Sequence, residues 1–166
     1  MRLLIPLADI TACVVFLTRI PIGVAGLDTE RELAQSAWAF SIVGALVGGV
    51  GTVVYAVAVG LGLAPLIAAT LSVGAMVAST GALHEDGLVD TVDGFGGGRD
   101  RAAKLRIMRD SHLGTFAVVA LFLVLVLRIM SLATLADPIA VGSILVATAT
   151  SSRTVMVAIM AWQAPA

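Results

Sequence analysis

The chain has 166 residues, of which 59% are hydrophobic and 13% are charged, and its formal net charge is -1. Soluble globular domains carry about 25% charged residues, so this composition, with a mean hydropathy of +1.05, excludes an ordinary soluble domain and indicates an integral membrane protein. Nucleic acid is not expected as a partner. A single cysteine, Cys13, excludes an internal disulfide and a CxxC metal or redox site.

The first apolar segment, residues 3–19, is short and interrupted. It contains Pro6 and Asp9, and Pro21 follows it closely, a position where proline stops a helix. The segment therefore either spans the membrane or enters it and returns. A polar connection over residues 23–35 comes next.

A long uncharged stretch follows this connection. No Lys, Arg, Asp or Glu occurs between Glu32 and Glu85, which leaves room for two helices of about 20 residues across the hydrocarbon core. We predict spans over residues 36–59 and 66–83, joined by a turn at 60–65. Three small residues in the first span predict close approach of another helix, within the chain or in a homo-oligomer: Gly44, Gly48 and Gly51.

The second half of the chain begins with a polar, glycine-rich loop over residues 84–113, which includes a short amphipathic helix. Two further spans, 114–135 and 139–162, are predicted after it, with a tight turn between them. The loop holds five basic residues, so the positive-inside rule places it in the cytoplasm. The predicted fold is a single all-α membrane domain over residues 1–166, a polytopic helical bundle with a cytoplasmic, acidic active-site loop.

Four carboxylates crowd into the start of this loop: Glu85, Asp86, Asp90 and Asp93. If the preceding helix continues through them, the three aspartates project from one face, where like charges repel unless a cation neutralises them. All-oxygen ligands select hard ions such as Mg²⁺, and Mg²⁺ commonly acts on substrate phosphates. A solvated acidic turn without a metal is the structural alternative.

Other polar residues near the acidic run extend this hypothesis. Glycines at 94, 96 and 97 allow a backbone to approach a ligand closely, and His84 is either a base, a ligand or a hydrogen-bonding histidine at the interface. Arg128 and Arg153 lie inside predicted spans, where each needs a partner or must reach toward the membrane boundary. A polar cavity that extends down from the acidic loop would supply such a partner.

Four motifs resemble the cobalamin synthase family, adenosylcobinamide-GDP ribazoletransferase. They are FLTRIP at 16–21, TGALHEDGL at 80–88, DTVDGFGGG at 90–98 and IMRDSHLGTF at 107–116. The resemblance implies a Mg²⁺-dependent enzyme of a bacterial or archaeal inner membrane. It would join adenosylcobinamide-GDP to alpha-ribazole, or to its 5'-phosphate, and release GMP. The family also implies further membrane segments after position 166.

The resemblance completes the predicted site. The predicted catalytic residues are Glu85, Asp86, Asp90 and Asp93. The predicted metal ligands are Asp86, Asp90, Asp93 and Asp110. The predicted substrate-binding residues are His84, Gly94, Gly96, Gly97, Arg109, Ser111 and Arg153. Membrane lipids are expected partners.

Two other functions stay open at this point. Paired carboxylates are similar to those of CDP-alcohol phosphotransferases, although here Asp86-Gly87 is followed by Leu88-Val89-Asp90 instead of that family's pattern. The acidic cluster could also belong to a non-catalytic membrane scaffold or cation carrier.

Overall fold

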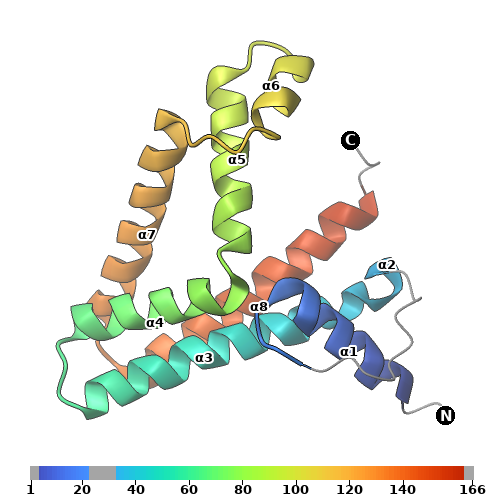
Figure 1. Ribbon diagram of the computed structural model, residues 1–166. Helices are drawn as coiled ribbons and strands as arrows, with labels where there is room; N and C mark the ends of the chain where they lie inside the picture. The colour runs from blue at the N-terminus through green and yellow to red at the C-terminus, as the bar shows by residue number, and fades with distance from the viewer. Residues whose placement is uncertain (1–3, 23–32, 163–166) are drawn as a thin grey trace.

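The computed structural model describes residues 4–22 and 33–162, and within these ranges all regular structure is helical (Figure 1). The all-α class is therefore confirmed. Three helices are long and apolar enough to cross a membrane, and a fourth crossing is counted if one bent pair of helices forms a single span. They carry the predicted spans 36–59, 114–135 and 139–162, with ends that differ from the prediction by at most a few residues.

The N-terminal helix α1, Leu4–Leu17, has 14 residues, fewer than the roughly 20 that a straight crossing requires. It packs against the helix α3, Phe40–Gly60, through Phe16, whose ring stacks on Phe40 with centroids 6.1 Å apart. Its buried Asp9 accepts hydrogen bonds from the Ser36 hydroxyl and the Trp38 indole, each at 3.0 Å. These contacts tie α1 to the start of the next helical segment.

The central pair of helices is α3, Phe40–Gly60, and α8, Pro138–Trp162. A short helix α2, Leu33–Ser36, and the 3-10 turn η1, Ala37–Ala39, lead into α3. A Cβ atom at Gly44 would lie 2.5 Å from the carbonyl oxygen of Ala149, and one at Gly48 would lie 2.7 Å from that of Leu145. The predicted close helix approach is thus confirmed, and it occurs within the chain, which leaves neither glycine free for a homo-oligomer contact.

Helix α4, Pro65–Thr80, packs on the other side of α3. The Ser72 hydroxyl donates a hydrogen bond to the Gly51 carbonyl at 2.7 Å, and a Cβ at Gly51 would lie 2.6 Å from the sulfur of Met76. The third predicted packing glycine therefore serves α4. In Figure 1, α3, α4 and α8 form the base of the molecule.

The chain then leaves the helix for two residues and turns sharply. Gly81 and Ala82 have φ of 62° and 61°, and the following helix α5, Leu83–Gly97, is bent by 88° relative to α4. The prediction of a loop from residue 84 is wrong for residues 84–97, which are helical. The preceding helix α4 does not continue through the acidic run, because Gly81 and Ala82 interrupt it. The three aspartates nevertheless lie on one continuous helix, α5.

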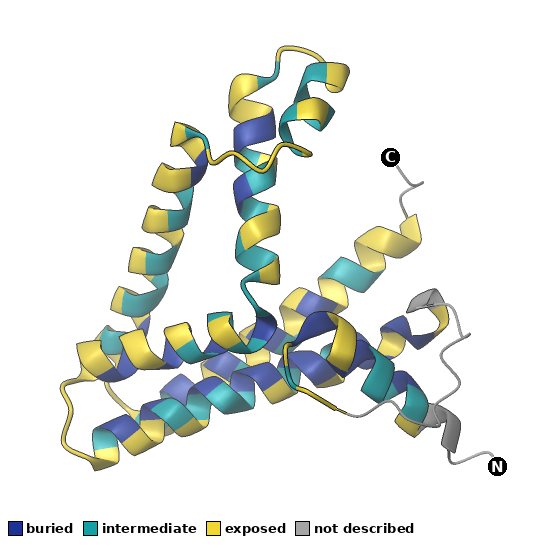
Figure 2. Ribbon diagram, viewed as in Figure 1, coloured by how far each residue is buried: buried dark blue, intermediate teal, exposed yellow. Residues whose placement is uncertain are grey.

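Helix α5 rises from the base beside α7, Thr115–Leu135, and the short helix α6, Arg101–Ile107, lies at their far end (Figure 1). The Asp100 carboxylate caps α6 by accepting a hydrogen bond from the Ala103 amide at 2.8 Å. Most residues of α7 are exposed, as the colouring of Figure 2 shows, in contrast to the buried face of α3. The rising arm formed by α5, α6 and α7 carries all of the acidic motif.

Candidate active site: an acidic helix beside an arginine-lined cavity

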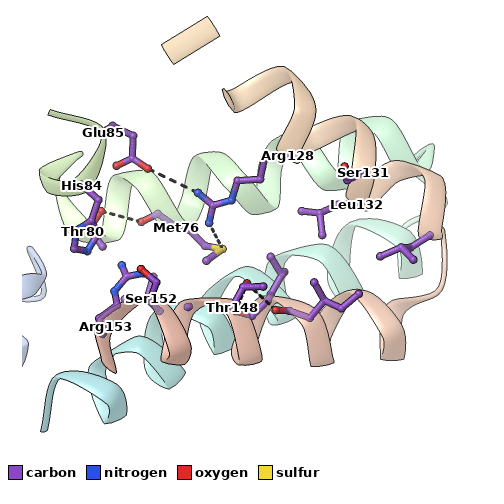
Figure 3. A pocket seen from close by; sticks show the side chains of 15 residues that line it. Met76, Thr80, His84, Glu85, Arg128, Ser131, Leu132, Thr148, Ser152 and Arg153 are labelled. Carbon is purple, nitrogen blue, oxygen red and sulfur yellow. Dashed lines mark hydrogen bonds and ion pairs between the residues drawn. The ribbon is translucent and has the colours of Figure 1, made fainter. Parts of the chain in front are cut away.

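A cavity of about 550 Å³ opens where the base meets the rising arm. Four of its polar lining residues are shown in Figure 3: His84 and Glu85 from the first turn of α5, Arg128 from α7 and Arg153 from α8. The remaining lining residues come from α3, α4, α7 and α8: Val47, Met76, Thr80, Ser131, Leu132, Leu135, Ile144, Leu145, Thr148, Ala149 and Ser152. We refer to this space as the arginine cavity.

Arg128 has the partner that its position in an apolar helix requires. Its Nη1 lies 3.8 Å from Oε1 of Glu85, and its Nη2 lies 3.6 Å from the sulfur of Met76 (Figure 3). Charged side chains inside membrane helices generally pair with one another or face a polar cavity. A cavity below the start of the acidic run is therefore present, and its polar end contains this ion pair, although most of its lining is apolar.

Arg153 is the most enclosed charge in the cavity, since only 7% of its surface is exposed. Its Nε is buried and has no hydrogen-bond partner among the residues that the structure describes. The same holds for Nε2 of His84 and Oε2 of Glu85. The predicted substrate-binding residues His84 and Arg153 are thus brought together, with unused hydrogen-bonding capacity.

The acidic residues after Glu85 lie on α5. Asp86 is exposed and Asp90 is partly exposed, and they are one helical turn apart, about 6 Å along the axis. Neither carboxylate has a hydrogen-bond or ion-pair partner within residues 4–22 and 33–162. We call these two residues the acidic pair.

Asp93 has a different environment. Its carboxylate is only 8% exposed and accepts hydrogen bonds from the backbone amides of Gly114 and, at 2.9 Å, Ala117. These amides belong to the N-terminus of α7, where backbone N–H groups have no partner inside the helix. A Cβ at Gly114 would lie 2.6 Å from the carboxylate, so glycine permits the close approach. Asp93, which lies on α5, therefore caps the N-terminus of α7.

Asp110 lies away from the other carboxylates, in the exposed connection after α6. It accepts a hydrogen bond from the backbone amide of His112 at 3.1 Å and pairs with the imidazole of the same residue. These hydrogen bonds lower the pKa of Asp110, and the carboxylate in turn raises the pKa of His112. Arg109 and Ser111 line a shallow hollow beside α6, apart from the arginine cavity.

The predicted substrate-binding glycines lie in packed positions. A Cβ at Gly94 would lie 2.7 Å from the Met108 side chain, and one at Gly96 would lie 2.6 Å from the ring of Phe116. A Cβ at Gly97 would lie 3.2 Å from the Ile107 side chain. Close packing of α6 and α7 against α5 accounts for small residues at these positions, so their role toward a substrate stays a prediction.

The predicted set of four metal ligands is not assembled. Within the described residues no group of three or more His, Cys, Asp or Glu side chains is placed to hold a metal ion. Mg²⁺ is often held by only one or two protein carboxylates, with water and substrate phosphates completing its shell. The acidic pair fits that role, because neither carboxylate has a partner among the described residues, whereas Asp93 and Asp110 are engaged elsewhere.

Some cavity residues were not identified as functional candidates from the sequence. Thr80, Ser152 and Thr148 line the cavity, but isolated hydroxyl residues in apolar helices give no signal of their own. Arg128 did give a signal, a charge inside an apolar span, and its partner Glu85 lies 43 positions earlier in the chain.

Comparison with known proteins was consistent with these features. The family model described as Cobalamin-5-phosphate synthase matches residues 9–166. A protein of Bradyrhizobium diazoefficiens, named adenosylcobinamide-GDP ribazoletransferase, is 42% identical over 96% of this chain and 62% of its own length. One of Mesorhizobium japonicum with the same name is 46% identical over 96% of this chain and 61% of its own. The chain thus spans about three fifths of these curated relatives. No solved structure matches.

Proposed function

The chain belongs to the cobalamin-5-phosphate synthase family, and from this premise we propose that it acts in the transfer of cobinamide phosphate from adenosylcobinamide-GDP to alpha-ribazole or its 5'-phosphate. The names of its relatives support this reaction. The structural observation that carries the proposal is the acidic pair, Asp86 and Asp90, which has no partner in the described part of the chain and lies on the same helix as the cavity residue Glu85.

In this reaction a hydroxyl oxygen of the ribazole forms a bond to the phosphorus attached to cobinamide, and the bond from that phosphorus to GMP breaks. The acidic pair would hold Mg²⁺, which when bound supplies positive charge to the phosphate oxygens. Glu85 is oriented by Arg128 through its Oε1. Its Oε2, which has no hydrogen-bond partner among the described residues, would accept the proton of the attacking hydroxyl.

The test is product formation, measured by mass spectrometry after the chain is supplied with adenosylcobinamide-GDP, alpha-ribazole 5'-phosphate and MgCl₂. Asp86→Ala and Asp90→Ala should each lower the rate by about 100-fold or more, the usual effect of removing a group that stabilises transition-state charge. Thr91→Ala is the matched control on the same helix, because Thr91 is exposed and its hydroxyl donates a hydrogen bond to the Gly87 carbonyl of its own helix. Full activity of both aspartate variants would refute the assignment.

We further propose that the site faces the cytoplasm of a bacterial inner membrane. Its support is the basic composition of the tip of the rising arm, where Lys and Arg residues mark cytoplasmic loops: Arg99, Arg101, Lys104, Arg106 and Arg109. A membrane-impermeant thiol reagent should label the Arg99→Cys variant only after the cells are permeabilised. It should label the Leu61→Cys variant in intact cells, from the outside. Both native residues are exposed, and the native Cys13 is fully buried. Labelling of Arg99→Cys in intact cells would reverse the orientation.

A further inference from the structure

The arginine cavity carries an excess of positive charge. Two guanidinium groups, Arg128 and Arg153, face one carboxylate, Glu85, across a space that is otherwise lined by neutral side chains when His84 is neutral. Arginine stays protonated in proteins. The carboxylate is engaged with Arg128, so the charge on Arg153 is left without a counter-anion from the described part of the chain.

The unused donors face into the cavity. Arg153 is only 7% exposed, and its Nε has no hydrogen-bond partner within residues 4–22 and 33–162. Figure 3 shows its guanidinium directed toward His84 and Thr80, across from Arg128. Buried donors without partners are rare in proteins. Guanidinium groups bind phosphate through paired hydrogen bonds, so the polar end of the cavity has the chemistry of a phosphate site.

The other end of the cavity is apolar. It is lined by aliphatic side chains of α7 and α8: Leu132, Leu135, Ile144 and Leu145. A volume of about 550 Å³ lies within the range of small-molecule sites and greatly exceeds what one phosphate group fills. The cavity therefore fits a phosphate ester whose organic part includes a sizeable apolar group.

We propose that the arginine cavity binds the acceptor as its phosphate ester, alpha-ribazole 5'-phosphate, with Arg153 and Arg128 on the phosphate and the aromatic base toward the aliphatic end. This assignment rests on the proposed function for the identity of the substrate. It is consistent with the position of the cavity, which ends at the first turn of α5 next to the acidic pair. An anionic lipid presents the same phosphate chemistry and is the competing occupant.

Binding is measured in nanodiscs of zwitterionic phosphatidylcholine, without Mg²⁺ and without the cobinamide donor, by calorimetric titration with alpha-ribazole 5'-phosphate and with alpha-ribazole. Loss of hydrogen bonds to a charged group corresponds to about 10- to 100-fold in affinity, so the phosphate ester should bind at least about 10-fold more tightly. Equal affinities, or no binding of either compound, would overturn the proposal. This test uses only the wild-type chain, so misfolding of a variant does not affect its result.

Arg153→Gln should abolish the preference, so that the phosphate ester and alpha-ribazole bind with about equal affinity. Arg153→Lys should retain part of the preference, because the positive charge stays but the planar, two-donor geometry of the guanidinium is lost. Arg101→Gln is the matched control, since Arg101 is exposed on α6 outside the cavity. A preference that persists in both Arg153→Gln and Arg128→Gln would overturn the proposal.

A second arm replaces part of the phosphatidylcholine with phosphatidylglycerol and follows lipid retention by native mass spectrometry. Phosphatidylglycerol retained by the wild-type chain, lost in Arg153→Gln and not displaced by alpha-ribazole 5'-phosphate would assign the cavity to lipid and overturn the proposal. The two hypotheses fail separately. A chain that prefers the ester but forms no product contradicts only the proposed function, whereas a chain that forms product without this preference contradicts only the cavity assignment.

Discussion

Replacement of Asp93 by alanine separates a structural carboxylate from the acidic pair on the same helix. The change removes two hydrogen bonds from a buried carboxylate to the amides of Gly114 and Ala117. Removing a helix N-cap costs about 0.5–2 kcal/mol, and a hydrogen bond to a charged group contributes about 1.5–3 kcal/mol. Because water can reach part of a helix end, we expect a loss of about 2–4 kcal/mol of unfolding free energy.

The assay is reversible unfolding in detergent micelles, followed by circular dichroism. Asp86→Ala is the matched control, because the native side chain is exposed and has no partner in the described chain; its stability should stay within about 0.5 kcal/mol of the wild type, while product formation falls. Asp93→Asn keeps one acceptor oxygen, so its unfolding free energy should lie between those of Asp93→Ala and Asp86→Ala. An Asp93→Ala chain as stable as Asp86→Ala would refute the capping role.

Two further predictions concern packing and protonation. Gly48→Ala should destabilise the chain by about 1–3 kcal/mol in the same assay, because its Cβ would lie 2.7 Å from the α8 backbone, whereas Gly49→Ala, with open space around it, should not; equal effects would contradict the α3–α8 contact. His112 should titrate above its usual pKa in an NMR titration, and Asp110→Asn should lower that pKa. Any stabilisation from this pair is fully present below the unfolded pKa and is lost as the pH rises through the raised folded pKa; an unchanged pKa in Asp110→Asn would contradict the pairing.

The long apolar helices could be predicted because their signal is local. An apolar stretch of about 20 residues without charges is expected to form a membrane helix whatever the rest of the chain does. The helices α3, α7 and α8 correspond closely to the predicted ranges. The packing role of Gly44 and Gly48 could be predicted for the same reason. Which helix they contact could not, since α8 follows them by about a hundred residues.

The acidic segment was misread because propensity and packing disagree there. Glycine and aspartate disfavour helix interiors, so Gly94, Gly96 and Gly97 indicated a loop. In the structure the same glycines admit Met108, Phe116 and Ile107 against α5, and this tertiary packing stabilises a helix that its composition does not favour. The cavity could be anticipated from Arg128 and Arg153, but its shape depends on the bend at Gly81 and Ala82, which no local pattern revealed.

That bend also has a consequence for how the protein is made. A continuous helix fixes the rotation of each later side chain, at about 100° per residue, but two left-handed residues separate α5 from α4, so α5 does not inherit its rotation from the helix before it. Its alignment comes from α7, whose first amides bind Asp93 across a sequence separation of 21 residues. During synthesis the acidic pair therefore acquires its direction only after the start of α7 has emerged.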